Sequence, residues 1–219
     1  MQRIDTVLFD LDGTLVDSIR LIADTLVKTL KEYVPGRTFT SAEIELMIGP
    51  PLAVTFAKFR PEADVIQTMI ERYRVIYKTD ELNSISLYPG AAETLLALKR
   101  RGFRLGLVTS KFTESAMPSL RHFAIDRLFD VIIGLESVTR HKPHPEPVEK
   151  ALSAFAHGEA VMVGDTESDL LAGKAAKILT CGVAWSFQHA ALAALHPDFW
   201  IHDYAELITA IEQYNMREE

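Results

Sequence analysis

A run of large apolar residues that ends in two carboxylates constrains this chain more than any other stretch. Val7 to Phe9 leads into Asp10-Leu11-Asp12, and Gly13 follows. An uninterrupted apolar run near the start of a chain predicts a strand that is buried on both faces of a parallel sheet. The aspartates then lie at the carboxyl end of that strand, where open α/β sheets bind their ligands. The stretch therefore predicts an α/β fold with an acidic site at one edge of the sheet.

Strands and helices alternate in the second part of the chain. Further strands are predicted at 103–109, 131–134, 160–164, 178–183 and 199–201. This alternation favours right-handed βαβ units and a doubly wound parallel sheet. The segment between the first two strands shows helical spacing only, so we expect an inserted all-helical domain. The predicted domains are an α/β core of residues 1–16 and 85–219 and a helical domain of residues 17–84.

Polar side chains follow three of the predicted strands, and parallel strands bring such side chains to one edge of the sheet. The candidate site residues are Asp10 and Asp12 after the first strand, Thr109 and Ser110 after the second, Asp165 and Asp169 after the fourth, and Lys142 from the loop before the helix that precedes the fourth strand. Carboxylates that lie this close to one another need a compensating cation. Their hard oxygen atoms suit Mg²⁺, and the lysine neutralises further charge.

These residue types also fit chemistry on phosphorus. One of the two carboxylates in Asp10-Leu11-Asp12 can act as the nucleophile, and the other can protonate the leaving oxygen and then activate water. The hydroxyl groups of Thr109 and Ser110 can hold the phosphoryl oxygens. The site would accept a small anionic phosphate compound.

Four ordered motifs resemble those of the haloacid dehalogenase-like hydrolases. They are Asp10-Leu11-Asp12-Gly13-Thr14-Leu15, Thr109, Lys142-Pro143 and Gly164-Asp165-Thr166-Glu167-Ser168-Asp169. The resemblance covers the whole chain. It implies that Asp10 is the nucleophile, which forms an aspartyl-phosphate, and that Asp12 is the general acid and base.

The same resemblance implies the remaining roles. Mg²⁺ would be bound by the Asp10 carboxylate, the main-chain oxygen of Asp12 and Asp165, with Asp169 helping directly or through water. Thr109 and Ser110 would bind phosphate, and Lys142 would steady both the nucleophile and the phosphate. The helical cap of this family, which closes over the site and supplies substrate contacts, matches residues 17–84.

Several shorter segments resemble one branch of this family, the PpaX-type pyrophosphatases. They are Pro35-Gly36-Arg37, Ile48 to Leu52, His141 to Val148 and Gly182 to Trp185. The resemblance implies hydrolysis of inorganic pyrophosphate. Phosphoglycolate phosphatases share the core and a similar cap, so they remain the alternative. His141 stands where many relatives have glycine, and the phosphate-gripping cap arginine of the sugar-phosphate mutases is not apparent near Gly49-Pro50-Pro51.

Other classes fit the pattern less well. An EF-hand loop that starts at Asp10 would need glycine at its sixth position and an acid at its twelfth, but these are Leu15 and Leu21. A phosphate-sensing regulatory protein of the receiver type lacks both the helical insertion and an acid at the place of Asp12. A dehalogenase would need neither Asp12 nor a metal site. For Trp185 and Phe187, core packing is favoured over a place beside the site.

Composition limits the partners and the compartment. The chain has 219 residues, a net charge of −7 and no stripe of basic residues, so no nucleic-acid partner is expected. Cys181 is the only cysteine, which excludes an internal disulfide and favours a buried thiol in a reducing compartment. The first residues are polar, and no apolar run reaches the length of a membrane span. We therefore expect a cytoplasmic protein that does not bind membranes, and the sequence leaves its oligomeric state open.

Overall fold

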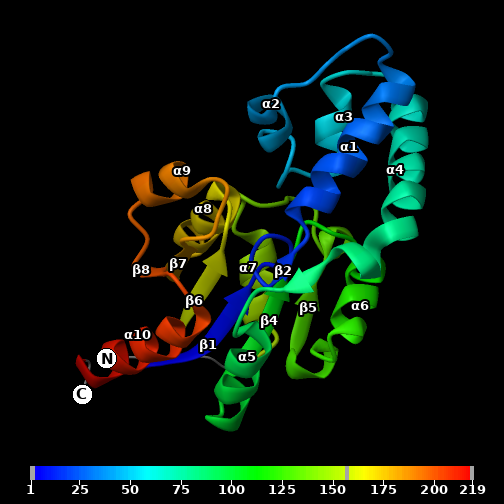
Figure 1. Ribbon diagram of the computed structural model, residues 1–219. Coiled ribbons are helices and arrows are strands. Elements are labelled where there is room, and N and C mark those ends of the chain that lie inside the picture. The colour runs from blue at the N-terminus through cyan, green and yellow to red at the C-terminus, as the bar shows by residue number, and fades with distance from the viewer. Residues whose placement is uncertain (1–2, 156–157, 218–219) are drawn as a thin grey trace. The chain divides into compact units, whose positions relative to one another are not determined.

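The computed structural model describes residues 3–155 and 158–217 (Figure 1). The chain forms two compact units, Met1–Val16 with Leu87–Glu219, and Asp17–Ser86. A two-stranded sheet of β2 (Val16–Asp17) and β3 (Ser86–Leu87) contains both points at which the chain passes between the units. The sequence predicted only helices for residues 17–84. This short pairing is therefore an addition to the prediction.

The first unit is built on a six-stranded parallel sheet with the order β5-β4-β1-β6-β7-β8. Its strands are β1 (Ile4–Phe9), β4 (Arg104–Val108), β5 (Val131–Ile133), β6 (Glu159–Gly164), β7 (Leu179–Val183) and β8 (Phe199–Ile201). The predicted α/β class with a doubly wound parallel sheet is confirmed. Strand β1 begins three residues before the apolar run at Val7, and the other predicted strands are present within one residue of their expected ends.

Strand β1 lies in the middle of the sheet, and the chain winds outward from it in both directions. Phe9 pairs with Leu107 of β4 on one side and with Val163 of β6 on the other. The carboxyl ends of these three strands are therefore level. This is the switch point of the winding, where sheets of this kind leave a crevice for ligands.

Helices cover both faces of the sheet (Figure 1). They are α5 (Ala91–Arg100), α6 (Thr113–His122), α7 (Glu146–Leu152), α8 (Glu167–Ala175), α9 (His189–Ala194) and α10 (Tyr204–Arg217), with short 3-10 turns at Asp126–Leu128 and Leu135–Ser137. Helices α5 and α10 pack on one face, and α7 and α8 pack on the other. Leu8, Val108 and Met162 from the three central strands form part of the core beneath α7 and α8.

The second unit consists of four helices, α1 (Ile19–Tyr33), α2 (Ser41–Glu45), α3 (Leu52–Ala57) and α4 (Ala63–Ser84). A capping box starts α2, because Thr40 and Glu43 bond to each other's main-chain N–H groups. Phe56 is fully buried, and its ring packs edge-on against Tyr73 of α4. A buried aromatic centre thus holds α3 against α4.

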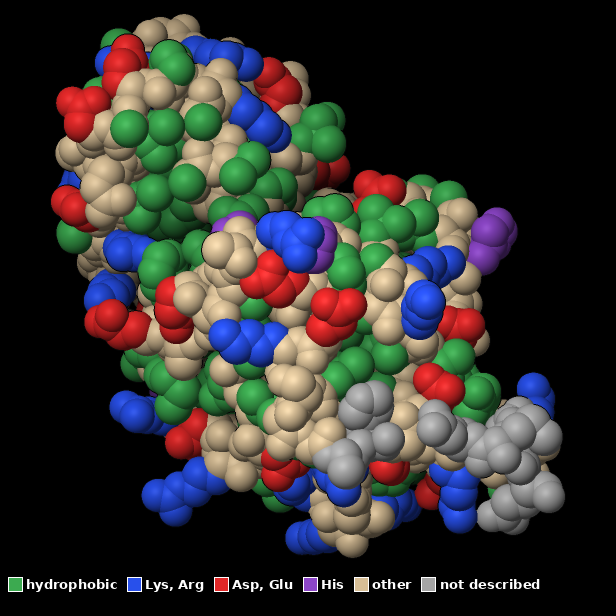
Figure 2. All heavy atoms as spheres, turned by 180° about the vertical axis from the view of Figure 1, so that it is seen from behind, with side chains coloured by type: hydrophobic (Ala, Val, Ile, Leu, Met, Phe, Trp, Pro, Cys, Tyr) green, Lys and Arg blue, Asp and Glu red, His purple; other side chains and the backbone are tan. Residues whose placement is uncertain are grey.

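The surface and the helices bear on two expectations, that the chain binds no nucleic acid and that it does not bind membranes. Figure 2 shows acidic and basic side chains interspersed over one face of the molecule. None of the helices within the described residues is long and apolar enough to cross a membrane. The expected absence of a nucleic-acid partner stays a prediction.

Candidate active site

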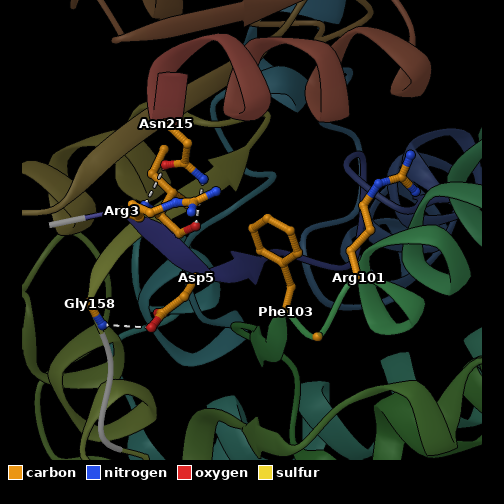
Figure 3. A pocket seen from close by; sticks show the side chains of 8 residues that line it. Arg3, Asp5, Arg101, Phe103, Gly158 and Asn215 are labelled. Atoms are coloured by element: carbon orange, nitrogen blue, oxygen red, sulfur yellow. Dashed lines mark hydrogen bonds between the residues drawn. The ribbon is translucent and has the colours of Figure 1, made fainter. Parts of the chain in front are cut away.

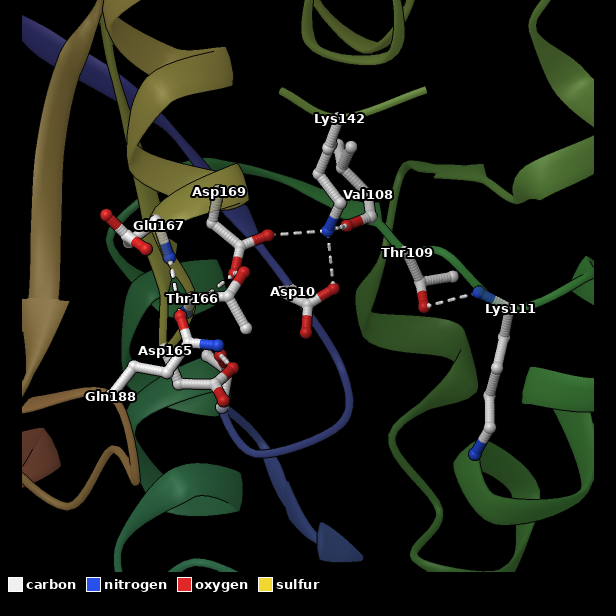
Figure 4. A network of polar contacts seen from close by, with 11 residues as sticks. Asp10, Val108, Thr109, Lys111, Lys142, Asp165, Thr166, Glu167, Asp169 and Gln188 are labelled. Atoms are coloured by element: carbon white, nitrogen blue, oxygen red, sulfur yellow. Dashed lines mark hydrogen bonds and ion pairs between the residues drawn. The ribbon is translucent and has the colours of Figure 1, made fainter. Parts of the chain in front are cut away.

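A buried lysine joins the ends of three strands. The Lys142 ammonium donates hydrogen bonds to Asp10 Oδ1 at 2.7 Å, to Asp169 Oδ1 at 2.6 Å and to the Val108 carbonyl at 2.9 Å (Figure 4). Asp10 follows β1, Val108 ends β4, and Asp169 lies in the first turn of α8 after β6. The Lys142 side chain is only 5% exposed. Three elements that are far apart in the sequence therefore share one buried positive charge.

Three carboxylates lie close enough together to hold a cation. Asp10, Asp165 and Asp169 are buried, and one oxygen from each lies within 4.8 Å of one oxygen from both others. Asp165 Oδ1 accepts a hydrogen bond from Thr14 Oγ1 at 2.7 Å. Asp165 Oδ2 is buried with no hydrogen-bond partner among the described residues. A buried carboxylate oxygen without a donor is a costly arrangement that a hard divalent cation would relieve. The donor set therefore fits such an ion.

Burial and mutual repulsion shift the protonation of these acids. Burial raises the pKa of Asp10 from 3.8 to about 7, with repulsion from Asp169 and Asp12 added, although the Lys142 ammonium lowers it. Burial, together with the charges of Asp10 and Asp169, also raises the pKa of Asp165 well above its usual value. Burial pulls the pKa of Lys142 down, but the Asp10 and Asp169 carboxylates outweigh it and raise that pKa above its usual value. Lys142 therefore stays charged, and simultaneous ionisation of Asp10 and Asp165 is unfavourable.

Local sequence explains why Asp169 reaches this place. Its Oδ2 accepts from the main-chain N–H of Thr166 at 3.0 Å and from the Thr166 hydroxyl at 2.6 Å, which ties the carboxylate to the start of α8. A Cβ on Gly164 would collide with the Asp169 side chain, so a larger residue there would displace the helix. Both Asp169 oxygens thus accept hydrogen bonds, one set from Thr166 and one from Lys142.

Asp12 lies beside the three-carboxylate group and has a lysine of its own. Gly13 turns the chain with a φ of +84°, just beyond β1. The Lys111 ammonium donates to Asp12 Oδ1 at 2.8 Å, and these two side chains are 17% and 15% exposed. No sequence pattern singles out Lys111, since a lysine after a hydroxyl pair in a loop resembles a surface residue. Only the pairing of β4 with β1 places it at Asp12.

The predicted phosphate-binding hydroxyls lie in the loop after β4. Thr109 is buried, its N–H donates to the Ile133 carbonyl, and its hydroxyl oxygen accepts from the main-chain N–H of Lys111 at 3.2 Å. Ser110, which lies between Thr109 and Lys111 in the chain, is half-buried. This loop therefore carries two hydroxyl groups and Lys111 next to the end of β1.

A carboxylate outside the site fixes the loop that carries Lys142. The Glu146 carboxylate accepts hydrogen bonds from the main-chain N–H groups of Thr139 and Arg140 and from the Thr139 hydroxyl. These bonds, led by that from the Thr139 main chain, lower the pKa of Glu146 to about 2. Glu146 therefore stays ionised and closes the loop around Lys142. The sequence pattern predicts no role for this residue.

The opposite edge of the sheet has a pocket of about 470 Å³, lined by Arg3, Asp5, Arg101, Phe103 and Asn215 among others (Figure 3). Two of its polar side chains make structural hydrogen bonds. The Asn215 side chain bonds to both the N–H and the carbonyl of Ile4, and Asp5 Oδ2 accepts from the Gly158 N–H at 2.9 Å. These bonds tie α10 and β6 to the start of β1. The candidate site residues gather at the other end of that strand.

The family model for haloacid dehalogenase-like hydrolases matches residues 7–183, which include every residue of the site described above. The chain belongs to the haloacid dehalogenase-like hydrolases, and the family predicted from its motifs is confirmed.

Individual relatives agree with this assignment. The chain is 40% identical over 211 residues to the pyrophosphatase PpaX of Bacillus pumilus, with 95% of this chain and 96% of that protein covered. It is 38% identical over 215 residues to the pyrophosphatase PpaX of Listeria monocytogenes, covering 95% and 97%. The resemblance to the pyrophosphatase branch is thereby confirmed.

Solved structures show the same fold. A haloacid dehalogenase-like hydrolase from Bacteroides fragilis superimposes with a TM-score of 0.85 at 28% identity, over 94% of this chain and all of that one. A predicted phosphoglycolate phosphatase from Haemophilus somnus gives a TM-score of 0.82 at 28% identity, covering 95% and 98%. The chain thus resembles pyrophosphatases in sequence and a predicted phosphoglycolate phosphatase in fold, so the fold alone does not select the substrate.

Proposed function

We propose that this chain is a Mg²⁺-dependent phosphohydrolase that cleaves inorganic pyrophosphate through an aspartyl-phosphate on Asp10. The observation that carries the proposal is the buried group of Asp10, Asp165 and Asp169 around Lys142, with an unpartnered carboxylate oxygen on Asp165. The names of the PpaX relatives support pyrophosphate as the substrate.

In the first step of the proposed reaction, a carboxylate oxygen of Asp10 attacks phosphorus. The bond from phosphorus to the bridging oxygen breaks, and Asp12 gives its proton to that oxygen as phosphate leaves. In the second step Asp12 takes a proton from water, the water oxygen attacks the phosphorus, and the bond to Asp10 breaks. The products are two phosphate ions, and both aspartates return to their starting states.

The other residues of the site orient the substrate. Thr109 and Ser110 donate hydrogen bonds to the phosphoryl oxygens, and Lys142 holds the Asp10 carboxylate through a contact of 2.7 Å. The Asp10, Asp165 and Asp169 carboxylates and the Asp12 carbonyl oxygen would hold the divalent cation. When bound, this cation supplies positive charge that offsets the carboxylates and the phosphate. When all four acids are ionised, Lys111 and Lys142 leave a net charge of −2 in the site, which a divalent cation would offset.

Lys111 supports an anionic leaving group. It lies 2.8 Å from the carboxylate that we assign to proton transfer, so it also lies near the departing oxygen. Phosphate as a leaving group carries several negative charges, whereas the alcohol from a simple phosphate ester carries none. A second lysine at this place favours the former. Phosphoglycolate phosphatase activity is the second candidate, because the predicted phosphoglycolate phosphatase from Haemophilus somnus shares this fold.

A comparison of substrates tests the proposal. We would measure kcat/KM for pyrophosphate, 2-phosphoglycolate and a panel of sugar phosphates under the same conditions with Mg²⁺, and use Asp10→Asn to correct for contaminating activity. The proposal predicts that pyrophosphate is preferred at least tenfold. A preference for phosphoglycolate would replace pyrophosphate by the second candidate. Residues 17–84 are proposed to be the cap that supplies the remaining substrate contacts.

A further inference from the structure

The loop after β7 lies one strand beyond the loop after β6, yet it bonds both to that loop and to the loop after β1. We call Ala184–Gln188 the β7 loop. The Trp185 indole N–H donates to the Gly13 carbonyl at 3.1 Å, in the turn that follows Asp12. The Ser186 hydroxyl donates to the main-chain carbonyl of Asp165 at 2.5 Å. Two successive residues therefore reach the loop after β1 and the loop after β6.

Ser186 and Gln188 extend this connection into helix α8. The Ser186 hydroxyl oxygen accepts from the Gln188 N–H at 2.8 Å, and Gln188 Oε1 accepts from the Glu167 N–H at 3.1 Å. Glu167 is the first residue of the helix that carries Asp169. Ser186 is buried, and its hydroxyl both donates to the Asp165 carbonyl and accepts from the Gln188 N–H. The β7 loop thus fixes the segment after β6, which carries both Asp165 and Asp169.

Aromatic packing holds the Trp185 side chain in place. Its ring lies between those of Tyr88 and Tyr204, at centroid distances of 5.2 and 5.1 Å. Tyr204 is fully buried, and its hydroxyl donates to the Thr14 carbonyl at 2.7 Å. The Tyr88 main-chain N–H donates to the Leu15 carbonyl at 3.0 Å. Trp185, Tyr204 and Tyr88 therefore satisfy three consecutive carbonyl groups directly after Asp12.

We propose that Trp185 and Ser186 are positioning residues that keep the loop bearing Asp10 and Asp12 in register with the loop bearing Asp165 and Asp169. Neither residue needs to touch the substrate. The proposed reaction, on which this inference rests, requires Asp10 and Asp12 on one loop to act with the carboxylates on the other. Both loops are bonded to adjacent residues of a third loop. A displacement of about 1 Å between reacting groups costs on the order of 10² in rate.

The placement of the phosphate-binding groups predicts how kinetics should respond. Thr109 and Ser110 come from the loop after β4, which lies on the other side of β1 from β6 and β7. Loss of the Trp185 or Ser186 bond should therefore lower kcat while KM changes little. A general loss of packing would instead lower thermal stability and the amount of active protein.

The test compares Trp185→Phe with Trp200→Phe, which changes the other tryptophan of the chain, in β8. The substrate is p-nitrophenyl phosphate with Mg²⁺, so the outcome does not depend on which phosphate compound is natural. Trp185→Phe should lower kcat roughly 10- to 100-fold with KM changed less than about threefold, and Trp200→Phe should keep the wild-type kcat. A wild-type kcat in Trp185→Phe, or an equal loss in both variants, overturns the role of Trp185.

Ser186 supplies a second test that does not require the indole to be replaced. Ser186→Ala should lower kcat at least tenfold, and Ser186→Thr, which keeps the hydroxyl, should recover most of it. Ser153→Ala is the control, because the Ser153 hydroxyl bonds to the Lys150 carbonyl on the exposed side of α7. Wild-type kcat in Ser186→Ala, or no recovery in Ser186→Thr when that variant folds, contradicts the proposal.

Discussion

Lys142 is the residue whose removal should affect this molecule most, and Lys142→Met is the sharpest perturbation. Methionine keeps the length and the apolar stem of the side chain but removes the ammonium. The variant leaves Asp10 and Asp169 without their shared cation and Val108 without a donor. The side chains of these two acids are 9% and 1% exposed, so water cannot replace the lost bonds.

The expected loss is that of a broken buried ion pair, about 3–5 kcal/mol in the free energy of unfolding of the metal-free protein. For a chain of this size it corresponds to a fall in Tm on the order of 10 °C. Lys99→Met is a matched control, since Lys99 also contacts an aspartate, Asp130, at 2.7 Å but with both side chains about one-third exposed. This surface pair should contribute less than about 1 kcal/mol.

The loss should also depend on pH. Lys142 lowers the pKa of Asp10, which is nonetheless about 7, so removal of the lysine raises that pKa further. An acid whose pKa is higher in the folded than in the unfolded protein destabilises the fold as the pH rises from its unfolded value. Lys142→Met should therefore lose more stability at pH 8 than at pH 5.5.

Tryptophan fluorescence during thermal unfolding in EDTA is a suitable assay, because Trp185 and Trp200 both lie in the first unit. Melting of Lys142→Met within about 2 °C of wild type at both pH values would refute the reasoning. So would a loss no larger than that of Lys99→Met.

Three further outcomes are expected. Asp10→Asn should lower turnover by about 10³ or more because it removes the nucleophile, and the fold should survive because the change also removes a buried charge. Full activity in steady-state assays would exclude the covalent mechanism. Saturating Mg²⁺ should raise the Tm more at pH 8 than at pH 5.5, since below pH 7 the ion must displace a proton from Asp10; equal shifts at the two values would contradict the raised pKa. Lys111→Gln should lower kcat/KM for pyrophosphate about tenfold more than for p-nitrophenyl phosphate, and Lys111→Arg should recover part of the loss; equal effects on both substrates would remove Lys111 from leaving-group recognition.

Much of the fold follows from local patterns in the sequence. The central strands are nearly continuous apolar runs because both of their faces are covered, and each run ends where the polar residues begin. Since parallel strands share one edge for their carboxyl ends, the sequence pattern alone places Asp10, Asp165 and the Thr109 loop together. Lys142 can be included because the order of the family motifs identifies it, although its own surroundings in the sequence are those of a surface loop.

The connections between loops cannot be read from the sequence. Lys111 reaches Asp12 only because β4 pairs beside β1, and no pattern around Lys111 indicates a buried ion pair. The sequence predicts core packing for Trp185, and its ring does pack between two tyrosines, but its N–H also bonds to the turn after Asp12. Such bonds join residues about 100 to 170 positions apart, so they depend on the three-dimensional arrangement of the loops.

The most direct test of the proposed mechanism is to trap the phosphoryl group on the protein. Wild-type protein would be mixed with ³²P-labelled pyrophosphate and Mg²⁺, quenched in acid within milliseconds, digested and sequenced by mass spectrometry. The proposal predicts label on the peptide that contains Asp10 and none in Asp10→Asn. Rapid hydrolysis with no label on the protein, or label on a different residue, would contradict it.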